Sequence, residues 1–547
     1  MHHTRSSEPD SCRAAVDSEA VAHGSFLDLL LSRTDDDAVF LIAYGADGAR
    51  TEWTVQQWRN AAIRGGRQLV EAGVRPGDRI GIPARNTALA LLSMFACWTA
   101  HACCVPLETE GLSLDGWNRA LDSTDCRFQV HFGESLHDES ELPAAAASRP
   151  SVVLALPPHP DESELPPPPV PAACGEVVGL CLYSSGTTGA PKGINLQYRN
   201  LLVNLDSMQT AFGWTPTDRV MTVLPISHGN GLIIGSLFPW YCGASVVLAE
   251  RFSRQAFWEV VAKERATVSS VVPTVLAYLD SDKDAVWAPD FREFVSGSGP
   301  LSRSLAARVS ARGPAIRQIY GLSETTCIVT MTPPRPAALD FQPDSALNHL
   351  VSVGPAVPHA DVAVLDGSGA PVGPGISGEV AVRGSVIMHS YHGQDPSLLE
   401  SQPWFRTGDQ GCWVAGPDGL PWFYITGRLK DIVIRGGRNI SPVEVEDALL
   451  GHPRIDEVLA FGVPHEALGE EIGVAIVSHA GISETEVRQF AETVLEKAKR
   501  PSLITCVPSI PRTRSGKAQR RSFSQSLLTG LQLSRDAHEA GPETSDE

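Results

Sequence analysis

The chain of 547 residues is 43% hydrophobic and 20% charged, a balance that is typical of globular proteins and excludes a wholly disordered, collagen-like or membrane-dominated chain. Its 44 basic and 63 acidic residues give a formal net charge of −19, which argues against nucleic acid or an anionic membrane as the main partner. At roughly 150 residues for each domain, the length favours about three or four structural units.

The cysteines and the two ends of the chain bear on where the protein works. The eleven cysteines form no CxxC pair and no zinc-ligand spacing, which favours a reduced, cytoplasmic setting. The first residues, MHHTRSSEPDSC, hold no apolar stretch of the kind that a signal peptide needs. Residues 1–24 are polar, and residues 527–547 are acidic and aperiodic, so both segments are expected to be solvated tails.

Short apolar runs alternate with helical patterns through the first part of the chain. Arg79–Pro83 has the pattern of a strand, and the apolar stretch 88–105 predicts a buried helix followed by a buried strand. This alternation is typical of α/β layering with parallel sheets. The proline-rich stretch 157–176 cannot continue a helix or pair inside a sheet, so we expect an exposed connector there.

After residue 428 the pattern changes to that of a compact α+β unit. Strand-like runs occur at 458–463 and 472–477. Two helix starts are predicted, one by an N-cap with a following proline and one by a capping box: Ser441, Pro442 and Glu444, then Ser483 and Glu486. We therefore expect a large domain over 25–429 and a smaller one over 430–526.

A buried-strand pattern over 177–183 leads directly into the loop YSSGTTGAPKG, residues 183–193. Its three glycines, four hydroxyl side chains and one lysine offer the backbone donors, side-chain donors and cation that a polyphosphate needs. A Walker A loop is excluded, because the lysine is preceded by proline and followed by glycine. The residues predicted to contact phosphate are Ser184, Ser185, Gly186, Thr187, Thr188, Gly189 and Lys192.

This loop and five later segments resemble, in order, the motifs of the adenylate-forming superfamily, which contains acyl- and aryl-CoA synthetases, peptide-synthetase adenylation domains and beetle luciferases. The later segments are LPISHGNG with His228, YGLSETT with Glu324, WFRTGD with Asp409, YITGRLKDIVIRGGRNISPVEVE with Arg428 and Lys430, and PRTRSGK with Lys517. The resemblance covers most of the chain. It implies an α/β fold with a large N-terminal domain of layered sheets and helices and a smaller, mobile α+β C-terminal domain.

The resemblance implies a site for ATP and Mg²⁺, and the residue types suit it. Tyr320 offers a ring face for adenine, followed by Gly321 in the same motif, and Ser323 offers a hydroxyl for phosphate. Glu324 offers a carboxylate oxygen for Mg²⁺, a hard cation that prefers oxygen ligands. Asp409 matches the family's aspartate that binds the ribose hydroxyls, a role that suits an acceptor-only carboxylate.

The resemblance also implies two half-reactions, in which an acid and ATP form an acyl-adenylate and a thiol then displaces AMP. In the family, the lysine that matches Lys517 stabilises the negative charge that develops between the acid and the α-phosphate. The residue that matches Lys430 is the hinge about which the small domain swings. Arg428 can donate to ribose or phosphate oxygens. The residues expected to take part in catalysis are Lys192, His228, Glu324 and Lys517.

The acid pocket is expected to be lined by His228, Gly229, Asn230, Ser298, Gly299 and Tyr320. Peptide-synthetase domains resemble one another in carrying an aspartate at the position of Gly229, so an α-amino acid substrate is disfavoured here. The motifs are more similar to the acyl-CoA synthetase branch, which implies a small carboxylic acid and CoA. A phosphopantetheinyl carrier protein as acceptor stays open, as do an unusual oxyacid, an oxygenase of luciferase type and a non-catalytic nucleotide-binding protein.

Overall fold

The computed structural model of the chain describes residues 26–109, 113–132, 150–154, 166, 176–184, 192–281, 287–333, 347, 350–513 and 518–539. Apart from residues 166 and 176, the predicted proline-rich connector lies outside them. The described cysteines are all unpaired, and the cytoplasmic setting stays a prediction. None of the described helices combines the length and the apolar character that crossing a membrane requires.

Eight strands within the described residues form a sheet that is parallel through its centre and antiparallel at both edges. The inner strands β10, β11 and β12 are buried at every residue, and β10 has the nearly continuous apolar run that is typical of a strand covered on both faces. The strands lie in the order β14 (Thr330–Met331), β13 (Ala315–Tyr320), β12 (Glu293–Ser296), β11 (Val268–Val271), β9 (Arg219–Thr222), β10 (Ser245–Ala249), β1 (Val39–Tyr44) and β2 (Arg50–Thr54).

A second sheet holds seven described strands, and it contains the predicted strand Arg79–Pro83 as β3. The order is β17 (Ser390–Tyr391), β8 (Lys192–Gln197), β7 (Val178–Ser184), β4 (Cys103–Leu107), β3, β5 (Phe128–Phe132) and β6 (Ser151–Leu154). The antiparallel pair β7 and β8 places Ser184 opposite Lys192. The two ends of the predicted phosphate loop therefore lie side by side.

The predicted buried helix is α3 (Ala88–Thr99), which packs against α2 (Val55–Glu71). The two helices approach closely, since a Cβ at Gly66 would lie only 2.1 Å from the Thr99 hydroxyl oxygen. The other described helices of the large domain are α1 (Phe26–Leu31), α4 (Leu114–Ser123), α5 (Tyr198–Phe212), the π-helix η2 (Asn230–Leu237), α6 (Phe238–Cys242), α7 (Arg254–Glu264), α8 (Pro273–Ser281), α9 (Arg303–Ser310), the 3-10 helix η3 (Ser323–Thr325) and α11 (Ser397–Glu400).

A third sheet, which the sequence did not predict, is antiparallel throughout its four described strands. Its order is β15 (Asp361–Leu365), β16 (Gly378–Arg383), β18 (Phe405–Ala415) and β19 (Pro421–Arg428). The last pair sets Asp409 opposite Arg428. This sheet therefore carries two of the predicted nucleotide residues to the boundary with the small domain.

The small domain follows the 3-10 helix η5 (Leu429–Asp431) and has an α+β core of its own, as predicted. Its strands are β20 (Val433–Arg435), β21 (Arg438–Ile440), β22 (Glu457–His465), β23 (Gly469–Val477) and β24 (Leu503–Cys506), and its helices are α12 (Pro442–Leu450), α13 (Glu484–Val494), the 3-10 helix η6 (Lys497–Lys499) and α14 (Arg520–Glu539). The capping box of Ser483 and Glu486 is confirmed.

Two expectations for this domain differ from the structure. Helix α12 begins at Pro442 as predicted, but Ser441 forms no cap hydrogen bond, because its hydroxyl donates to the Thr426 carbonyl instead. The predicted tail from residue 527 begins inside α14, where Phe523, Leu527 and Leu528 pack on strand β22. These three apolar residues share one helix face, which explains why the helix continues past the predicted boundary.

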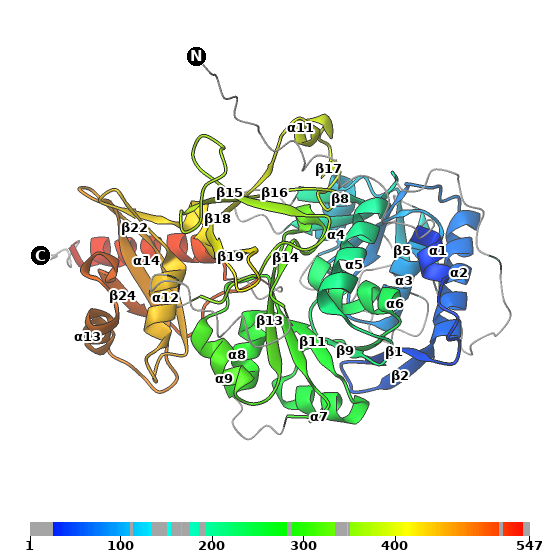
Figure 1. Cartoon of the computed structure of the whole chain (residues 1–547), viewed down its shortest axis with the longest axis horizontal. Helices are drawn as coiled ribbons and strands as arrows, with labels where there is room; N and C mark the ends of the chain where they lie inside the picture. Colours follow the sequence, from blue (N-terminus) through cyan, green and yellow to red (C-terminus); the bar gives the residue numbers. More distant parts are fainter. Residues whose placement is uncertain are drawn as a thin grey trace, which may run out of the picture.

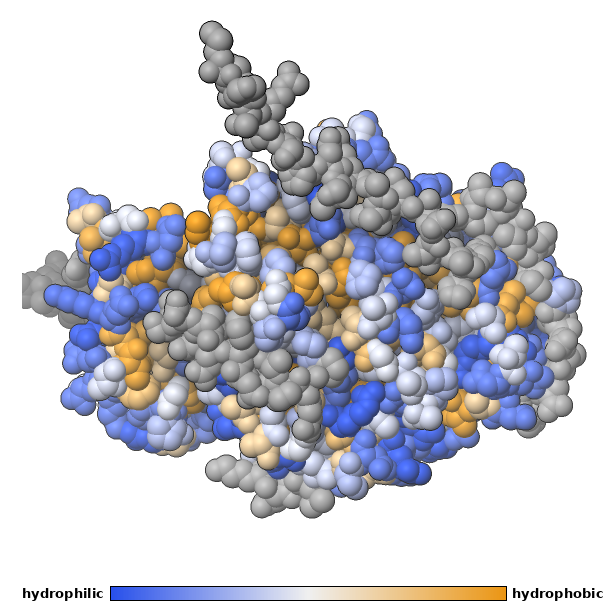
Figure 2. All heavy atoms as spheres, in the orientation of Figure 1, coloured by the Kyte–Doolittle hydropathy of each residue, from blue (hydrophilic) through white to orange (hydrophobic). Residues whose placement is uncertain are grey.

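The two domains lie side by side (Figure 1). The small domain, orange to red, lies beside α8 and α9 of the large domain, and α12 contacts β19. On the face shown in Figure 2, hydrophilic residues alternate with smaller apolar patches over both domains.

Candidate active site

The turn after β13 brings the predicted nucleotide residues to the carboxyl end of the first sheet. Tyr320 ends the strand, and the chain then turns through Ser323–Thr325. A Cβ at Gly321 would lie 1.9 Å from the Cys327 carbonyl oxygen, so this tight turn requires glycine. Thr326 has a φ of 64°, which is uncommon for a β-branched residue and is typical of backbone held in place at a functional site.

Asp409 joins this turn to the third sheet. Its side chain is 5% exposed, accepts a hydrogen bond from the Tyr320 hydroxyl at 2.8 Å and pairs with Arg428 Nε at 2.7 Å. Burial, together with the Asp409 charge, raises the pKa of Tyr320 well above its usual value, so the hydroxyl keeps its proton and donates. The three residues predicted to contact adenine and ribose are therefore linked through one buried carboxylate.

Lys192 and Glu324 are linked through Tyr391, a residue that the sequence did not single out. The Tyr391 hydroxyl donates to Glu324 Oε1 at 3.1 Å, and Lys192 Nζ lies 5.0 Å from the centre of the Tyr391 ring. Strand β17 pairs with β8, so Tyr391 lies opposite Ile194 and close to the lysine's own strand. A predicted phosphate ligand and a predicted metal ligand therefore meet at one aromatic ring.

The surroundings of Glu324 fit the magnesium role predicted for it. Mg²⁺ in nucleotide enzymes takes one or two carboxylates, and substrate phosphates and water supply its other ligands. Glu324 Oε1 accepts from Tyr391, and no described residue donates to Oε2. The described residues hold no cluster of three protein side chains that could ligate a metal.

His228 lies two residues before η2, on the acid side of the predicted site. Its Nε2 is 3.4 Å from Glu108 Oε1, and its Nδ1 is 3.5 Å from the Ser227 hydroxyl. The side chain is 26% exposed, so His228 is neither a buried core histidine nor a fully solvated one. Its ring is thus oriented by a carboxylate that the sequence did not single out.

Asn86, from the loop between β3 and α3, holds the segment that leads to this histidine. The side chain is buried and donates to the carbonyls of Leu224 at 3.0 Å and Ala249 at 3.2 Å. Its oxygen accepts from the Ile226 N–H at 2.9 Å. One amide thus satisfies three backbone groups and fixes the path of the chain toward the acid side.

The other predicted acid-pocket residues come from η2 and from the loop after β12. Ser270 Oγ donates to Asn230 Oδ1 at 2.6 Å, which joins η2 to β11. A Cβ at Gly229 would meet the Thr326 carbonyl at an ordinary contact distance of 3.5 Å, so this position lies against the nucleotide turn. Ser298, which precedes Gly299, has a φ of 65°. Like Thr326, it adopts a backbone conformation that is uncommon for a residue with a side chain.

Two sets of contacts flank the predicted hinge, one within the small domain and one between the two domains. Lys430 is exposed, and its carbonyl accepts a hydrogen bond from the Arg521 guanidinium of α14. Asp431 pairs with the same guanidinium at 3.4 Å. On the other side, the hydrogen bond from Ser441 to Thr426 ties the start of α12 to β19.

Some of the predicted residues lie outside the described part of the chain. These are Lys517 and the loop residues from Ser185 to Gly189, and Ser184 is described only through its backbone in β7. Their roles stay predictions. The contacts above join Tyr320, Asp409 and Arg428 in one group and link Lys192 to Glu324 through Tyr391 in a second. The turn at 320–324 connects the two groups.

Tyr391, Asn86 and Glu108 were missed by reasoning from the sequence. Asn86 had a usable signal, because it follows a parallel strand at its carboxyl end, where loops of α/β proteins carry functional groups. Tyr391 had none nearby, since its glutamate partner is 67 residues away along the chain.

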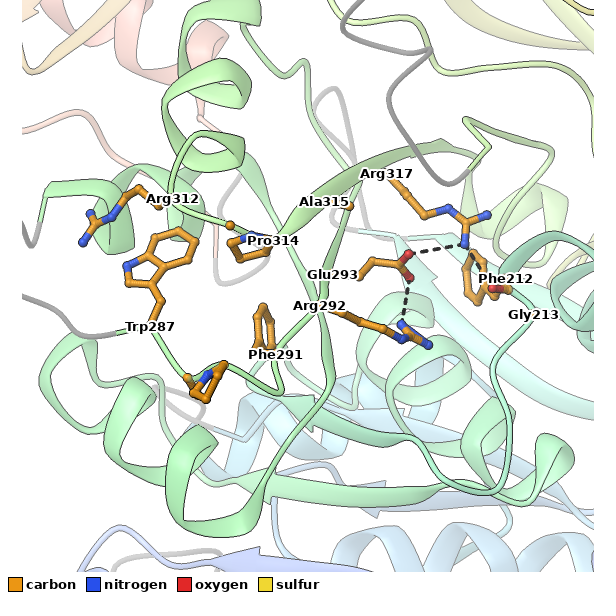
Figure 3. A pocket seen from close by; sticks show the side chains of 13 residues that line it. Phe212, Gly213, Trp287, Phe291, Arg292, Glu293, Arg312, Pro314, Ala315 and Arg317 are labelled. Carbon is orange, nitrogen blue, oxygen red and sulfur yellow. Dashed lines mark hydrogen bonds and ion pairs between the residues drawn. The ribbon is translucent and has the colours of Figure 1, made fainter.

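The hollow of about 590 Å³ in Figure 3 lies at the opposite end of the first sheet, where β12 and β13 begin. The one carboxylate among its described lining residues, Glu293, is shared by two arginines. Glu293 lies 3.5 Å from Arg317 and 3.8 Å from Arg292, and Arg312 covers the Trp287 ring. Because the predicted residues gather at the carboxyl ends of the strands, this hollow does not belong to the candidate site.

Most of the chain matches known protein families. Residues 31–392 match the model of the AMP-binding enzyme family, and residues 444–517 match that of the AMP-binding enzyme C-terminal domain. A sulfoacetate–CoA ligase from Cupriavidus necator is 33% identical over 481 residues, which cover 83% of this chain and 89% of that protein.

Two solved structures share the fold. ATP-bound MatB from Rhodopseudomonas palustris gives a TM-score of 0.78 at 25% identity, covering 92% of this chain and 98% of that one. The o-succinylbenzoate–CoA synthetase MenE from Bacillus subtilis, with ATP and a magnesium ion, gives 0.74 at 25% identity, covering 91% and 98%. The family and fold predicted from the motifs are thus confirmed, and the chain belongs to the AMP-binding enzyme family as an AMP-forming ligase of the acyl-CoA synthetase type.

Proposed function

We propose that this protein uses Mg²⁺-bound ATP to convert a small carboxylic acid into its acyl-adenylate, and then transfers the acyl group to coenzyme A. The observation that carries the proposal is a pair of contacts on either side of the turn after β13: Asp409 bonds to Tyr320, and Glu324 bonds to Tyr391, whose ring lies near Lys192. The CoA ligases among its relatives and structural neighbours support the same reaction.

Each of these residues has a part in binding the nucleotide. Asp409 accepts hydrogen bonds from the ribose hydroxyls while Arg428 and Tyr320 hold its carboxylate in place. Lys192 brings a cation to the phosphates. Glu324 would hold Mg²⁺, which neutralises phosphate charge when it is bound.

In the first half-reaction, a carboxylate oxygen of the acid attacks the α-phosphorus, and the bond to pyrophosphate breaks. Lys517 stabilises the charge that develops, and His228 lies beside the acid. In the second half-reaction, the sulfur of CoA attacks the acyl carbon and AMP leaves. Residues 430–526 act as a lid that turns about Lys430 between the two steps, which the short segment η5 permits.

The acid side favours a substrate with a second polar group. The Ser270 hydroxyl donates to Asn230 Oδ1, so the Asn230 side chain can use its amide nitrogen to donate to a substrate oxygen. An alkyl chain in its place would leave that donor without a partner, at a cost of roughly 1–3 kcal/mol. The sulfoacetate–CoA ligase relative, whose named substrate carries a second acidic group, supports this class of acid.

ATP–pyrophosphate exchange over a panel of aliphatic, aromatic, dicarboxylic, sulfonated and amino acids tests the proposal. We expect exchange with small polar acids, followed by the matching acyl-CoA in mass spectrometry when CoA is added. Exchange with amino acids alone would contradict the choice of acid. If the acyl-adenylate forms but no acyl-CoA appears, the result would favour a carrier protein as the acceptor.

A further inference from the structure

We propose that Tyr391 is a positioning residue that sets the Mg²⁺-binding carboxylate of Glu324 and the phosphate-binding ammonium of Lys192 relative to each other. The inference rests on the proposed function, because it assigns Tyr391 a part in binding Mg²⁺-ATP. It concerns how the chain prepares the site before any ligand arrives.

The first argument is the way in which the 388–391 segment holds Glu324. The Tyr391 hydroxyl donates to Oε1, and the Met388 N–H donates to the Glu324 backbone carbonyl at 2.8 Å. Both the side chain and the backbone of the glutamate are therefore fixed by one short segment. Because one oxygen accepts from Tyr391, the carboxylate cannot rotate freely, and Oε2 becomes the oxygen that is offered to a metal.

The hydroxyl is well suited to this task. A tyrosine hydroxyl carries its proton at physiological pH, so it donates to the Glu324 carboxylate. A phenylalanine would preserve the ring and lose only this donor.

The second argument is the position of Lys192. Its ammonium lies over the Tyr391 ring, and no described carboxylate lies within ion-pair distance of it. Next to Tyr391, the His392 N–H donates to the Gly193 carbonyl at 2.7 Å, which ties the two strands together. The ring attracts the cation without neutralising it, so the ammonium keeps its charge for a phosphate.

The chain contains a matched arrangement on β1, which four strands separate from β13 in the first sheet. The Tyr44 hydroxyl donates to Glu264, and Lys263 Nζ lies 5.3 Å from the centre of the Tyr44 ring. There, however, Arg50 pairs with Glu264 at 2.9 Å, and all four residues belong to β1, β2 and α7. Tyr44→Phe thus removes the same kind of hydrogen bond without touching the candidate site.

Isothermal titration calorimetry of the full chain with ATP, in excess Mg²⁺ and in EDTA, tests the inference. Tyr391→Phe is expected to weaken binding in Mg²⁺ by roughly 10- to 100-fold, the size of one hydrogen bond to a charged group, and to leave binding in EDTA nearly unchanged. Tyr391→Leu, which also removes the ring, should weaken binding in both conditions. Tyr44→Phe should match the wild type in both.

Equal affinities of Tyr391→Phe and wild type in Mg²⁺ would overturn the inference while leaving the proposed function in place. An equal loss in Mg²⁺ and EDTA would also overturn it, because a general structural defect does not distinguish the two conditions. A wild-type protein that binds no ATP would remove the proposed function and this inference with it. Thermal unfolding of each variant checks the fold, and if Tyr391→Leu fails to fold, Tyr391→Phe decides alone.

Discussion

Asp447 of α12 makes the contact between the two domains dependent on pH. It lies in the docked lid, close to the Ser302 hydroxyl at the N-cap of α9. Its Oδ1 is buried without a hydrogen-bond partner among the described residues. Burial destabilises the charged form of such a carboxylate. Asp447→Asn puts a neutral side chain of similar shape in its place, so the variant measures the free-energy cost of the charge.

The size and sign of the effect follow from the pKa. Burial raises the pKa of Asp447 from 3.8 to about 6, and the nearby Ser302 hydroxyl opposes part of that rise. The docked carboxyl therefore keeps its proton to a higher pH than the undocked one. Docking is most favourable below the undocked value and weakens as pH rises from about 4 to about 6. Above that pH the charge costs about 3 kcal/mol, from about 1.4 kcal/mol for each pH unit between the two pKa values.

Amide hydrogen exchange of α12 measures this cost, since variant and wild type compared at one pH share the same intrinsic exchange rates. Asp447→Asn should slow opening of α12 by about 5-fold at pH 4.5 and about 100-fold at pH 8. Glu466→Gln, an exposed change elsewhere in the lid, should leave exchange of α12 unchanged at both values. If the exchange rates of Asp447→Asn and wild type differ by the same factor at pH 4.5 and pH 8, the reasoning is refuted, because only a titrating group makes that factor change with pH.

Substitutions at the lid, nucleotide and acid positions are expected to separate their roles. Lys517→Ala should abolish most adenylate formation yet leave CoA transfer from a supplied acyl-adenylate largely intact, and equal losses in the two separate assays would count against a moving lid. Asp409→Asn should raise the KM for ATP by roughly 10- to 100-fold, measured by pyrophosphate exchange, because it weakens acceptance from the ribose hydroxyls. Asn86→Ala should lower stability in urea unfolding by on the order of 3 kcal/mol, because three buried backbone groups lose their partner.

Elements with a strong local signal could be predicted from the sequence. β3, α3 and β4 follow directly from apolar patterning, and the capping box at Ser483 fixes where α13 begins. The third sheet could not be predicted. In β18 the alternation of apolar residues is interrupted by Gly408 and Gly411, and a Cβ at Gly411 would lie 2.5 Å from the Tyr424 carbonyl oxygen of the neighbouring strand.

The candidate site likewise contains residues that the sequence predicts and residues that only the fold reveals. Motifs identify Glu324 and Lys192 because each residue type suits its chemistry, but they do not show what holds the two side chains together. That task falls to Tyr391, whose position depends on β17 pairing with β8. Likewise, the N-cap pattern places Ser441 correctly at the start of α12, yet its hydroxyl is used across the hinge, which only the docked domains make visible.

Under the proposed function, the position of Lys430 lets the nucleotide stay bound while the lid turns. Asp409 and Arg428 both precede the hinge, so a rotation about Lys430 leaves their ion pair intact. The hydrogen bond from Ser441 and the contact of Asp447 both span the hinge and break in the same rotation. One is a single hydrogen bond, worth about 1 kcal/mol, and the other carries an unfavourable charge above pH 6. These two contacts are therefore weak, and the rotation must also part Val443 of α12 from the apolar cluster of Leu350, Cys412 and Tyr424. Under the proposed function, Asp409 and Arg428 hold the nucleotide and belong to the domain that does not move.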